Sequence, residues 1–184
     1  TRQQIRRSLR GYTQRYGEPA LNAAGTADQA IALFREAGHW HRQRWPDSGF
    51  DNPAFTRFHE TLIKRGIDHN TVSLMRVSAG GRTVGVFFYL LAGDAVCFYL
   101  QGVQPEADAK LKPGLMSHAL LMQHFLERGA SVYDFMGGDS QYKRQLADRT
   151  TSFMMLHWHN GALRFRLEDA ARTLRDRYRP GDSA

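Results

Sequence analysis

The sequence predicts an α/β fold built on a mixed, largely antiparallel sheet. Two helical segments are followed by three strands that only tight turns separate, which is the pattern of an antiparallel meander. A helix then separates the third strand, 95–103, from a short apolar strand, 132–136. Two strands joined by a helical crossover can lie parallel in one sheet, so the pair predicts a mixed sheet.

The first segment, residues 1–15, is predicted to be a basic, linker-like helix, and residues 16–184 are predicted to form the folded domain. Five arginines precede Glu18, the first acidic residue, and the whole chain carries a net charge of +7. This balance favours an anionic partner, such as CoA phosphates, tRNA, an acidic polysaccharide or a membrane surface. The alternative is a solvated helix that binds nothing.

Two capped helices follow an extended stretch over residues 16–24. Thr26 or Asp28 can accept hydrogen bonds from the first free amides of a helix that ends near Pro46. Asn52 precedes a proline and begins the next helix, and Gly66 follows the predicted end of that helix.

The strands follow a period of two. Residues 71–78 and 82–91 flank Ala79-Gly80-Gly81, and Ala92-Gly93-Asp94 leads into 95–103. Both junctions have the glycines that tight hairpins require. Later elements are a helix over 113–128 that is apolar on most sides, a last strand over 150–160 and a final helix over 162–178.

Composition limits the class of protein. A chain of 184 residues with 42% hydrophobic content suits one globular domain. Cys97 is the sole cysteine, so no intrachain disulfide forms and a reducing, cytoplasmic setting is expected. No window approaches the ~20 apolar residues that span a bilayer. Because the chain begins at Thr1 rather than Met, we expect it to be the C-terminal part of a longer protein.

Several chemistries lack their required residues. There is no Gly-x-Ser-x-Gly elbow, P-loop or dinucleotide-binding glycine pattern. The pairs His39/His41 and His157/His159 have no third ligand nearby in sequence, so no metal site is predicted.

Residues 132–147 contain the strongest functional signal. A buried strand ends at Gly137-Gly138, because glycine reaches the backbone angles of a tight exit. Asp139 or Ser140 can cap a short helix whose first turn carries Tyr142 and Lys143. The end of a buried strand is where α/β enzymes place reactive groups.

The pairs Asp134-Phe135, Gly138-Asp139 and Tyr142-Lys143 resemble the signature of the CelD-like branch of the GNAT acyltransferase superfamily, which is related to the Fem-type aminoacyl transferases. The turn Lys112-Pro113-Gly114-Leu115 is a second match. The resemblance implies a GNAT fold with helices on both faces of the sheet. It also implies transfer of an acyl group from acetyl-CoA or another acyl-CoA to an amine or hydroxyl, with a cell-envelope or exopolysaccharide building block as the acceptor.

The resemblance also implies a cofactor site. The family binds the CoA pyrophosphate at the N-terminus of the helix after the fourth strand, where unpaired amides solvate phosphate. The usual Arg/Gln-x-x-Gly-x-Gly/Ala loop is absent, and only one of its glycines is matched, which puts CoA use in doubt. A bulge near Gln101 would open the strand to the acyl group. The expected cofactor residues are Gln101, Gly102, Val103, Lys110, Lys112, Gly114, Leu115, Met116 and Ser117.

Acyl transfer needs a proton acceptor and a donor for the oxyanion. By resemblance to the Fem-type lysine, Lys143 is expected to contact the oxyanion or a phosphate. Asp139 is either a general base or a helix cap, and Tyr142 either protonates the leaving group or packs a wall of the pocket. The expected substrate contacts are His41, Arg44, Trp45 and Asp134.

Two alternatives remain open from the sequence. The first is a Fem-like transferase that takes its donor from aminoacyl-tRNA, which the basic N-terminus would suit. The second is a non-catalytic GNAT-like module that binds a partner.

Overall fold

A computed structural model describes residues 1–154, 156, 158, 162, 163, 165 and 167–171. The chain divides into two compact units, Thr1–Asp148 and Arg149–Ala184. The first unit contains every strand among the described residues and all the elements that position the site.

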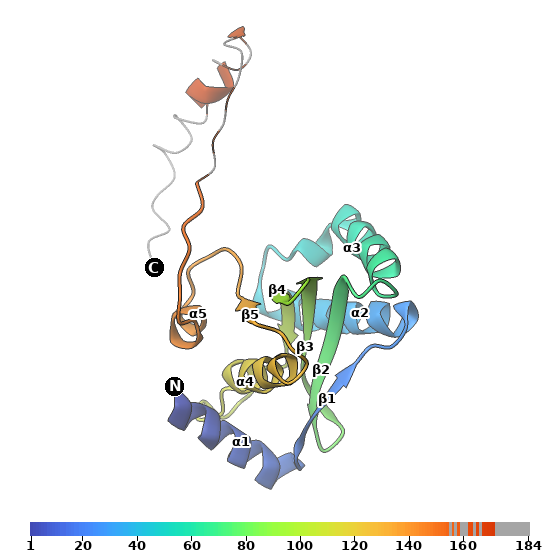
Figure 1. The fold of residues 1–184 in the computed structure, drawn as a ribbon, viewed down its shortest axis with the longest axis vertical. Coiled ribbons are helices and arrows are strands. Elements are labelled where there is room, and N and C mark those ends of the chain that lie inside the picture. The colour runs from blue at the N-terminus through green and yellow to red at the C-terminus, as the bar shows by residue number, and fades with distance from the viewer. Residues whose placement is uncertain (155, 157, 159–161, 164, 166, 172–184) are drawn as a thin grey trace. The chain divides into compact units, whose positions relative to one another are not determined.

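Helices and strands of the first unit follow the predicted order (Figure 1). They are α1 (Arg2–Tyr16), β1 (Pro19–Ala23), α2 (Ala27–Arg44), a short 3-10 turn (Gly49–Asp51), α3 (Pro53–Gly66), β2 (Val72–Ala79), β3 (Arg82–Ala92), β4 (Ala95–Val103), α4 (Pro113–Leu126), β5 (Val132–Asp134) and α5 (Gln141–Leu146). The predicted caps are confirmed for two helices: Thr26 accepts from the Gln29 amide at 3.3 Å, and Asn52 accepts from the Ala54 amide at 2.9 Å.

The sheet has the order β1-β2-β3-β4-β5. Strands β1 to β4 are antiparallel neighbours, and β5 pairs parallel to β4. The mixed, largely antiparallel sheet expected from the sequence is therefore confirmed. The hairpin between β2 and β3 turns through Gly80 (φ 56°) and Gly81 (φ 80°). A Cβ on Gly80 would meet the Tyr16 carbonyl, so this glycine also lets the hairpin approach α1 closely.

Each face of the sheet carries its own buried cluster, because successive strand residues point to opposite faces. Met75, Phe87 and Tyr89 pack on the face that α1 and α4 cover. Leu74 and Phe88 pack on the opposite face, under α2 and α3. Figure 1 shows α4 and α2 on opposite sides of the strands, as the resemblance implied.

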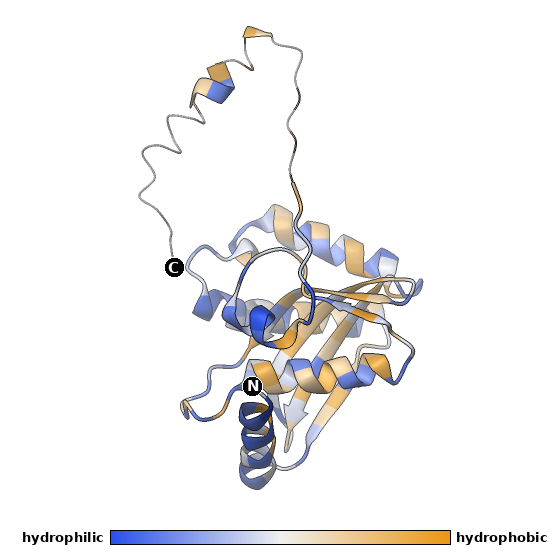
Figure 2. Cartoon of the chain, turned by 60° about the vertical axis from the view of Figure 1, so that its left-hand side comes forward, coloured by the Kyte–Doolittle hydropathy of each residue, from blue (hydrophilic) through white to orange (hydrophobic). Residues whose placement is uncertain are grey.

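Helix α1 is packed as well as basic. Hydrophilic residues cover most of its surface (Figure 2), yet Ser8 is fully buried and Tyr12 is 2% exposed. The two positions lie one turn apart and so share the face that meets α4. This packing differs from the expected linker-like helix: the compact unit begins at Thr1 and has no boundary after residue 15.

The last predicted strand is wrong for the residues described within it. Residues 150–154, 156 and 158 form neither strand nor helix, since no partner strand pairs with them and a period-two pattern without a partner does not make a strand. Residues 163, 165 and 167–171 are helical, in line with the predicted final helix, and its remaining residues lie outside the described part. In the described part of the chain, no helix is both long and apolar enough to cross a membrane.

Candidate active site

A cleft of about 780 Å³ lies within the first unit, and five elements line it. They are the start of α1, the C-terminal end of α2, β4, the N-terminal turns of α4, and the segment from the end of β5 through α5. All the lining residues fall between Gln4 and Gln145.

The cleft begins where two parallel strands separate. Strand β5 pairs with β4 only from Ala95 to Cys97, while β4 continues to Val103. The residues of β4 beyond the pairing, except Gly102, line the cleft. Their backbone on this side has no strand partner among the described residues, so polar groups of β4 are available to a ligand.

The N-terminus of α4 meets this opening. Lys112 holds the cap position but provides no side-chain cap, and Pro113 at the first turn has no amide hydrogen. The Met116 amide bonds to the Lys112 carbonyl at 3.0 Å. The amides of Gly114 and Leu115 have no acceptor among the described residues, and both residues line the cleft with Lys112. Free amides and a lysine at a helix N-terminus suit a phosphate.

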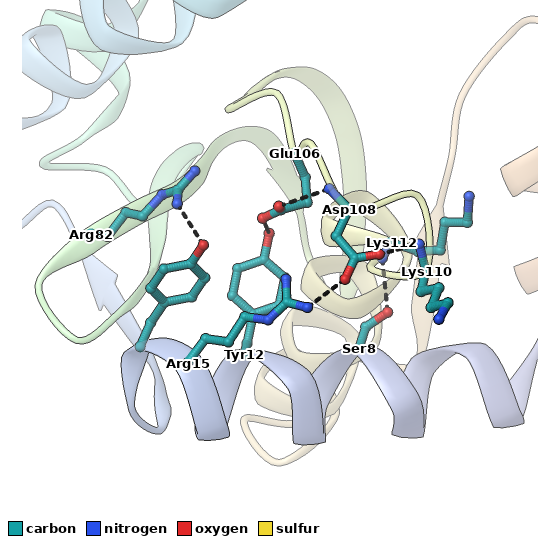
Figure 3. Close-up of polar contacts among 9 residues, drawn as sticks. Ser8, Tyr12, Arg15, Arg82, Glu106, Asp108, Lys110 and Lys112 are labelled. Carbon is teal, nitrogen blue, oxygen red and sulfur yellow. Dashed lines mark hydrogen bonds and ion pairs between the residues drawn. The ribbon is translucent and has the colours of Figure 1, made fainter.

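Helix α1 holds the loop that leads into α4 (Figure 3). Ser8 Oγ accepts from the Lys112 amide at 2.8 Å, and Tyr12 Oη donates to Glu106 at 3.0 Å. Arg15 pairs with Asp108 at 2.5 Å. Three contacts from one face of α1 therefore hold the loop that precedes α4, up to and including Lys112.

The glycine exit after β5 is braced by Lys143. Its Nζ donates to the Gly137 carbonyl at 2.5 Å, while Gly138 adopts φ 92°. Burial lowers the pKa of the Lys143 ammonium. Asp134 does not line the cleft, and its Oδ1 accepts from the Met136 amide at 2.6 Å. Its role in substrate binding stays a prediction from the sequence.

The other two predicted catalytic residues also line the cleft. Asp139 forms an ion pair with Arg144 at 2.5 Å, with both side chains largely exposed. Tyr142 stacks on His118, with ring centroids 5.2 Å apart and planes 9° apart. Burial raises the pKa of the Tyr142 phenol, so it stays protonated at neutral pH and remains a donor.

The end of α2 forms another wall of the cleft. His41 Nδ1 lies 2.9 Å from Ser48 Oγ, and burial lowers the pKa of its imidazole. The Arg44 guanidinium stands 5.6 Å from the ring centre of Trp45, which is 53% exposed. An exposed aromatic ring beside a guanidinium can hold a polar acceptor by stacking and hydrogen bonding.

Several predicted cofactor residues lie away from the cleft. Gly102 packs against α2, where a Cβ would fall 2.2 Å from the Ala37 carbonyl oxygen, and Met116 and Ser117 are fully buried. The Lys110 side chain does not line the cleft, and its amide donates to Asp108. The expected bulge near Gln101 is displaced, because the β3–β4 register shifts between Phe88/Tyr89 and leaves Tyr99 as the extra residue.

Sequence reasoning missed His118. It lines the cleft from the second turn of α4, is 1% exposed, and its Nε2 has no hydrogen-bond partner among the described residues. Its spacing of four from Gly114 places both on one helix face, and this spacing could have pointed to it. Tyr99 was also missed; its Oη lies 2.7 Å from Nε2 of the buried His59.

No group of three or more His, Cys, Asp or Glu residues suited to a metal occurs in the part of the chain that the structure describes. His157 and His159, one of the two pairs considered from the sequence, lie outside that part.

The family model of the acetyltransferase (GNAT) domain matches residues 1–144. The chain belongs to this GNAT family. Two solved structures of an aminoglycoside acetyltransferase from an uncultured soil metagenomic sample, in complex with sisomicin and with trehalose, share the fold. Each is 11% identical and covers 80% of this chain and 97% of its own, with TM-scores of 0.53 and 0.54. None of the curated proteins matches this chain in sequence.

As a GNAT domain, the chain is a GNAT-type acyltransferase. GNAT acetyltransferases take the acetyl group from acetyl-CoA. The residues of this cleft suit that donor, because the free Gly114 and Leu115 amides and Lys112 provide the positive end that a pyrophosphate requires.

Proposed function

We propose that this GNAT domain transfers an acetyl or other acyl group from acyl-CoA to an amine or hydroxyl. The pyrophosphate binds at the N-terminus of α4, and the thioester enters the opening between β4 and β5. The acceptor binds against the α2 wall and attacks the thioester directly, without a covalent enzyme intermediate. The position of Cys97 supports direct attack, because this thiol is only partly exposed and does not line the cleft, where a covalent intermediate would have to form.

One observation carries the proposal: the uncapped N-terminus of α4 and the divergence of β4 from β5 open into the same cleft. The first feature suits the phosphates of a donor and the second suits its extended arm. A site for phosphate alone would not require the opening between the strands.

The three residues of the α5 region have separate proposed roles. Lys143 supplies positive charge at the glycine exit, where an oxyanion or phosphate can share it. Tyr142 packs the wall and can protonate the departing thiolate. Asp139 is the proposed proton acceptor, although its ion pair with Arg144 competes for the same oxygens.

For the acceptor, we propose a chemical class rather than a single compound. The α2 wall presents His41, Arg44 and Trp45, which suit a polar molecule with an amine or hydroxyl. The resemblance of the Tyr142-Lys143 region to the CelD-like branch supports a cell-envelope or exopolysaccharide building block in this role.

Calorimetric titration with acetyl-CoA and with desulfo-CoA tests the donor. We expect saturable binding at one site for both, since the phosphates rather than the sulfur provide the helix contact. Lys112→Ala should weaken binding about tenfold, because a charge-assisted contact contributes roughly 1.5 kcal/mol or more.

Lys110→Ala is the matched control, because it removes the same charge two residues earlier, outside the cleft. Equal weakening by both variants would show only a general charge effect. If neither nucleotide binds the unaltered protein, the CoA proposal is overturned, and an aminoacyl-tRNA donor becomes the interpretation to test.

A further inference from the structure

His118 is buried but only half partnered. Its Nδ1 lies 2.9 Å from Tyr133 Oη, whereas Nε2 has no partner among the described residues. A polar atom buried without a partner costs about 1–3 kcal/mol. Because His118 lines the cleft, this cost is recovered if a ligand atom meets Nε2.

The neighbouring phenols define which nitrogen carries the proton. Tyr89 is fully buried, and its Oη lies 2.9 Å from Tyr133 Oη, which is the sole hydrogen-bond partner that Tyr89 has in the described part of the chain. If Tyr89 donates to Tyr133, and Tyr133 donates to His118 Nδ1, both phenol protons are bonded. The reverse direction leaves one phenol proton buried without an acceptor, so the first arrangement is favoured. It places the imidazole proton on Nε2.

This imidazole is a neutral donor. Burial first, and then the charge of Lys143, lower its pKa to about 3. At neutral pH the ring is therefore uncharged and is too weakly basic to serve as an efficient general base. His118 lines the cleft, and a neutral imidazole N–H in such a residue is suited to donate to an oxygen that gains negative charge.

The ring is held rigidly in this orientation. Tyr142 stacks on one side at 5.2 Å, and Phe98 and Phe135 meet the ring edge to face at 4.7 and 5.3 Å. A donor fixed in an apolar enclosure needs little reorganisation when charge develops, which is the condition for strong stabilisation of an oxyanion.

We propose that His118 is a catalytic residue that donates its Nε2 hydrogen to the carbonyl oxygen of the acyl thioester, and that Tyr133 and Tyr89 are positioning residues that hold this tautomer. This inference rests on the proposed acyl-CoA function. The acceptor nitrogen or oxygen forms a bond to the carbonyl carbon, and the C=O electron pair moves onto the oxygen that His118 contacts. The pair then returns, the C–S bond breaks, and the thiolate leaves. The acceptor loses one proton and the thiolate gains one, so protons balance.

The first measurement needs no ligand. Nitrogen-15 NMR of histidine-labelled protein distinguishes protonated from unprotonated ring nitrogens, and the His118 signals are those lost in His118→Gln. We expect a neutral ring protonated on Nε2. A ring protonated on Nδ1 would overturn the inference. Tyr133→Phe should shift the ring toward a mixture of tautomers.

The second measurement uses acetyl-CoA labelled with carbon-13 at the carbonyl, bound to the full chain, with difference infrared spectroscopy. Donation from Nε2 lowers the carbonyl stretching frequency, so His118→Leu and Tyr133→Phe should raise it again. His118→Gln, whose amide reaches about as far as Nε2, should retain part of the shift. An unchanged band in His118→Leu or Tyr133→Phe, with acetyl-CoA still bound, would overturn the proposal.

Tyr16→Phe is the matched control, because it also removes one hydrogen-bonded phenol hydroxyl, at a position that does not line the cleft. The Tyr16 hydroxyl accepts from the Arg82 guanidinium at 2.9 Å. The carbonyl band with Tyr16→Phe should match that of the unaltered protein, and an equal change in both Tyr→Phe variants would overturn the specific role of His118. Failure of calorimetry to detect acetyl-CoA binding would instead overturn the proposed function, and the inference with it.

Discussion

Gly102 and Gly114 were predicted from the sequence to serve the same cofactor, but their surroundings differ. A Cβ at Gly102 would fall within 2.5 Å of the Ala37 backbone, whereas a Cβ at Gly114 meets no atom within 4 Å. Gly102 therefore permits β4 and α2 to approach closely. Gly114 leaves room in front of the α4 amides, where a ligand can reach them.

The two glycines should consequently respond in opposite ways to alanine. Gly102→Ala forces backbone apart and should lower the free energy of unfolding by about 1–3 kcal/mol. Gly114→Ala should leave stability unchanged or slightly raised, because alanine is the better helix former, while weakening acetyl-CoA binding. Denaturant unfolding and calorimetry measure the two effects. Loss of stability in Gly114→Ala would contradict the open environment of that residue.

Lys143 illustrates a residue with two candidate tasks. It bonds to the Gly137 carbonyl, and it is the proposed source of charge for the reaction. Lys143→Met keeps the aliphatic stem and removes the charge. We expect the rate of acyl transfer to fall by about tenfold or more, on the scale of losing an electrostatic contact in the transition state.

Thermal unfolding separates the two tasks of Lys143. Its side chain is only partly buried, so the melting temperature of Lys143→Met should change little. Lys64→Met removes the same charge from an exposed position on α3, outside the cleft, and it is the matched control. Equal rates in Lys143→Met and the unaltered protein would remove Lys143 from the mechanism.

At the scale of elements, α1 acts as a support for the phosphate-binding turn. Ser8 of α1 accepts a hydrogen bond from the Lys112 amide, which lies directly before the free amides of α4. Ser8→Ala removes the acceptor of that amide without adding volume. We expect acetyl-CoA affinity to fall about fivefold, since a net hydrogen bond contributes roughly 1 kcal/mol.

Gln14→Ala is the control for this element, because Gln14 lies on the exposed face of the same helix. Calorimetric dissociation constants for both variants provide the comparison. If Ser8→Ala binds acetyl-CoA as tightly as Gln14→Ala, the loop is preorganised without α1, and the support role is wrong.

The elements also show where the sequence was informative. Helix caps and glycine turns are local, so Thr26, Asn52 and the Gly80-Gly81 hairpin were predicted at their observed places. The bulge of β4 was predicted two residues too late. Its place at Tyr99 depends on how β3 and β4 align, which is a property of two strands rather than of one.

At the scale of the whole molecule, stability should depend on pH through histidines that folding buries fully or in part. Burial lowers the pKa values of His41, His59, His118 and His124, and that of His118 falls to about 3. The unfolded chain, with ordinary values near 6.5, then binds more protons than the folded protein as acid is added. Stability is therefore fully present above pH ~6.5 and is lost as pH falls below it.

His118 alone should remove about 2 kcal/mol of stability between pH 7 and pH 5, by linkage between values near 6.5 and 3. The free energy of unfolding of His118→Gln should therefore fall by about 2 kcal/mol less than that of the unaltered protein between pH 7 and pH 5. Denaturant unfolding at both pH values measures this difference. The exposed His69→Gln is the control and should behave as the unaltered protein. An identical pH response in His118→Gln would contradict the buried neutral ring.

The sequence by itself determined the order of helices and strands, the mixed sheet and the glycine exit that leads to Tyr142-Lys143. These follow from periodicity, capping and turn residues, all of which act over a few neighbouring positions. The resemblance of residues 132–147 to GNAT acyltransferases also indicated the GNAT family, and the domain match over residues 1–144 established it.

The tertiary structure alone decided which of the candidate residues meet. It placed α1 against the loop before α4, turned Gly102 toward α2, and brought His118 together with Tyr133 and Tyr142, which lie 15 and 24 positions further along the chain. Such contacts join elements far apart in sequence, and they depend on how side chains fill the space between the diverging strands. No local sequence pattern encodes that packing. Only the folded structure therefore shows that Nε2 of His118 is buried without a hydrogen-bond partner among the described residues.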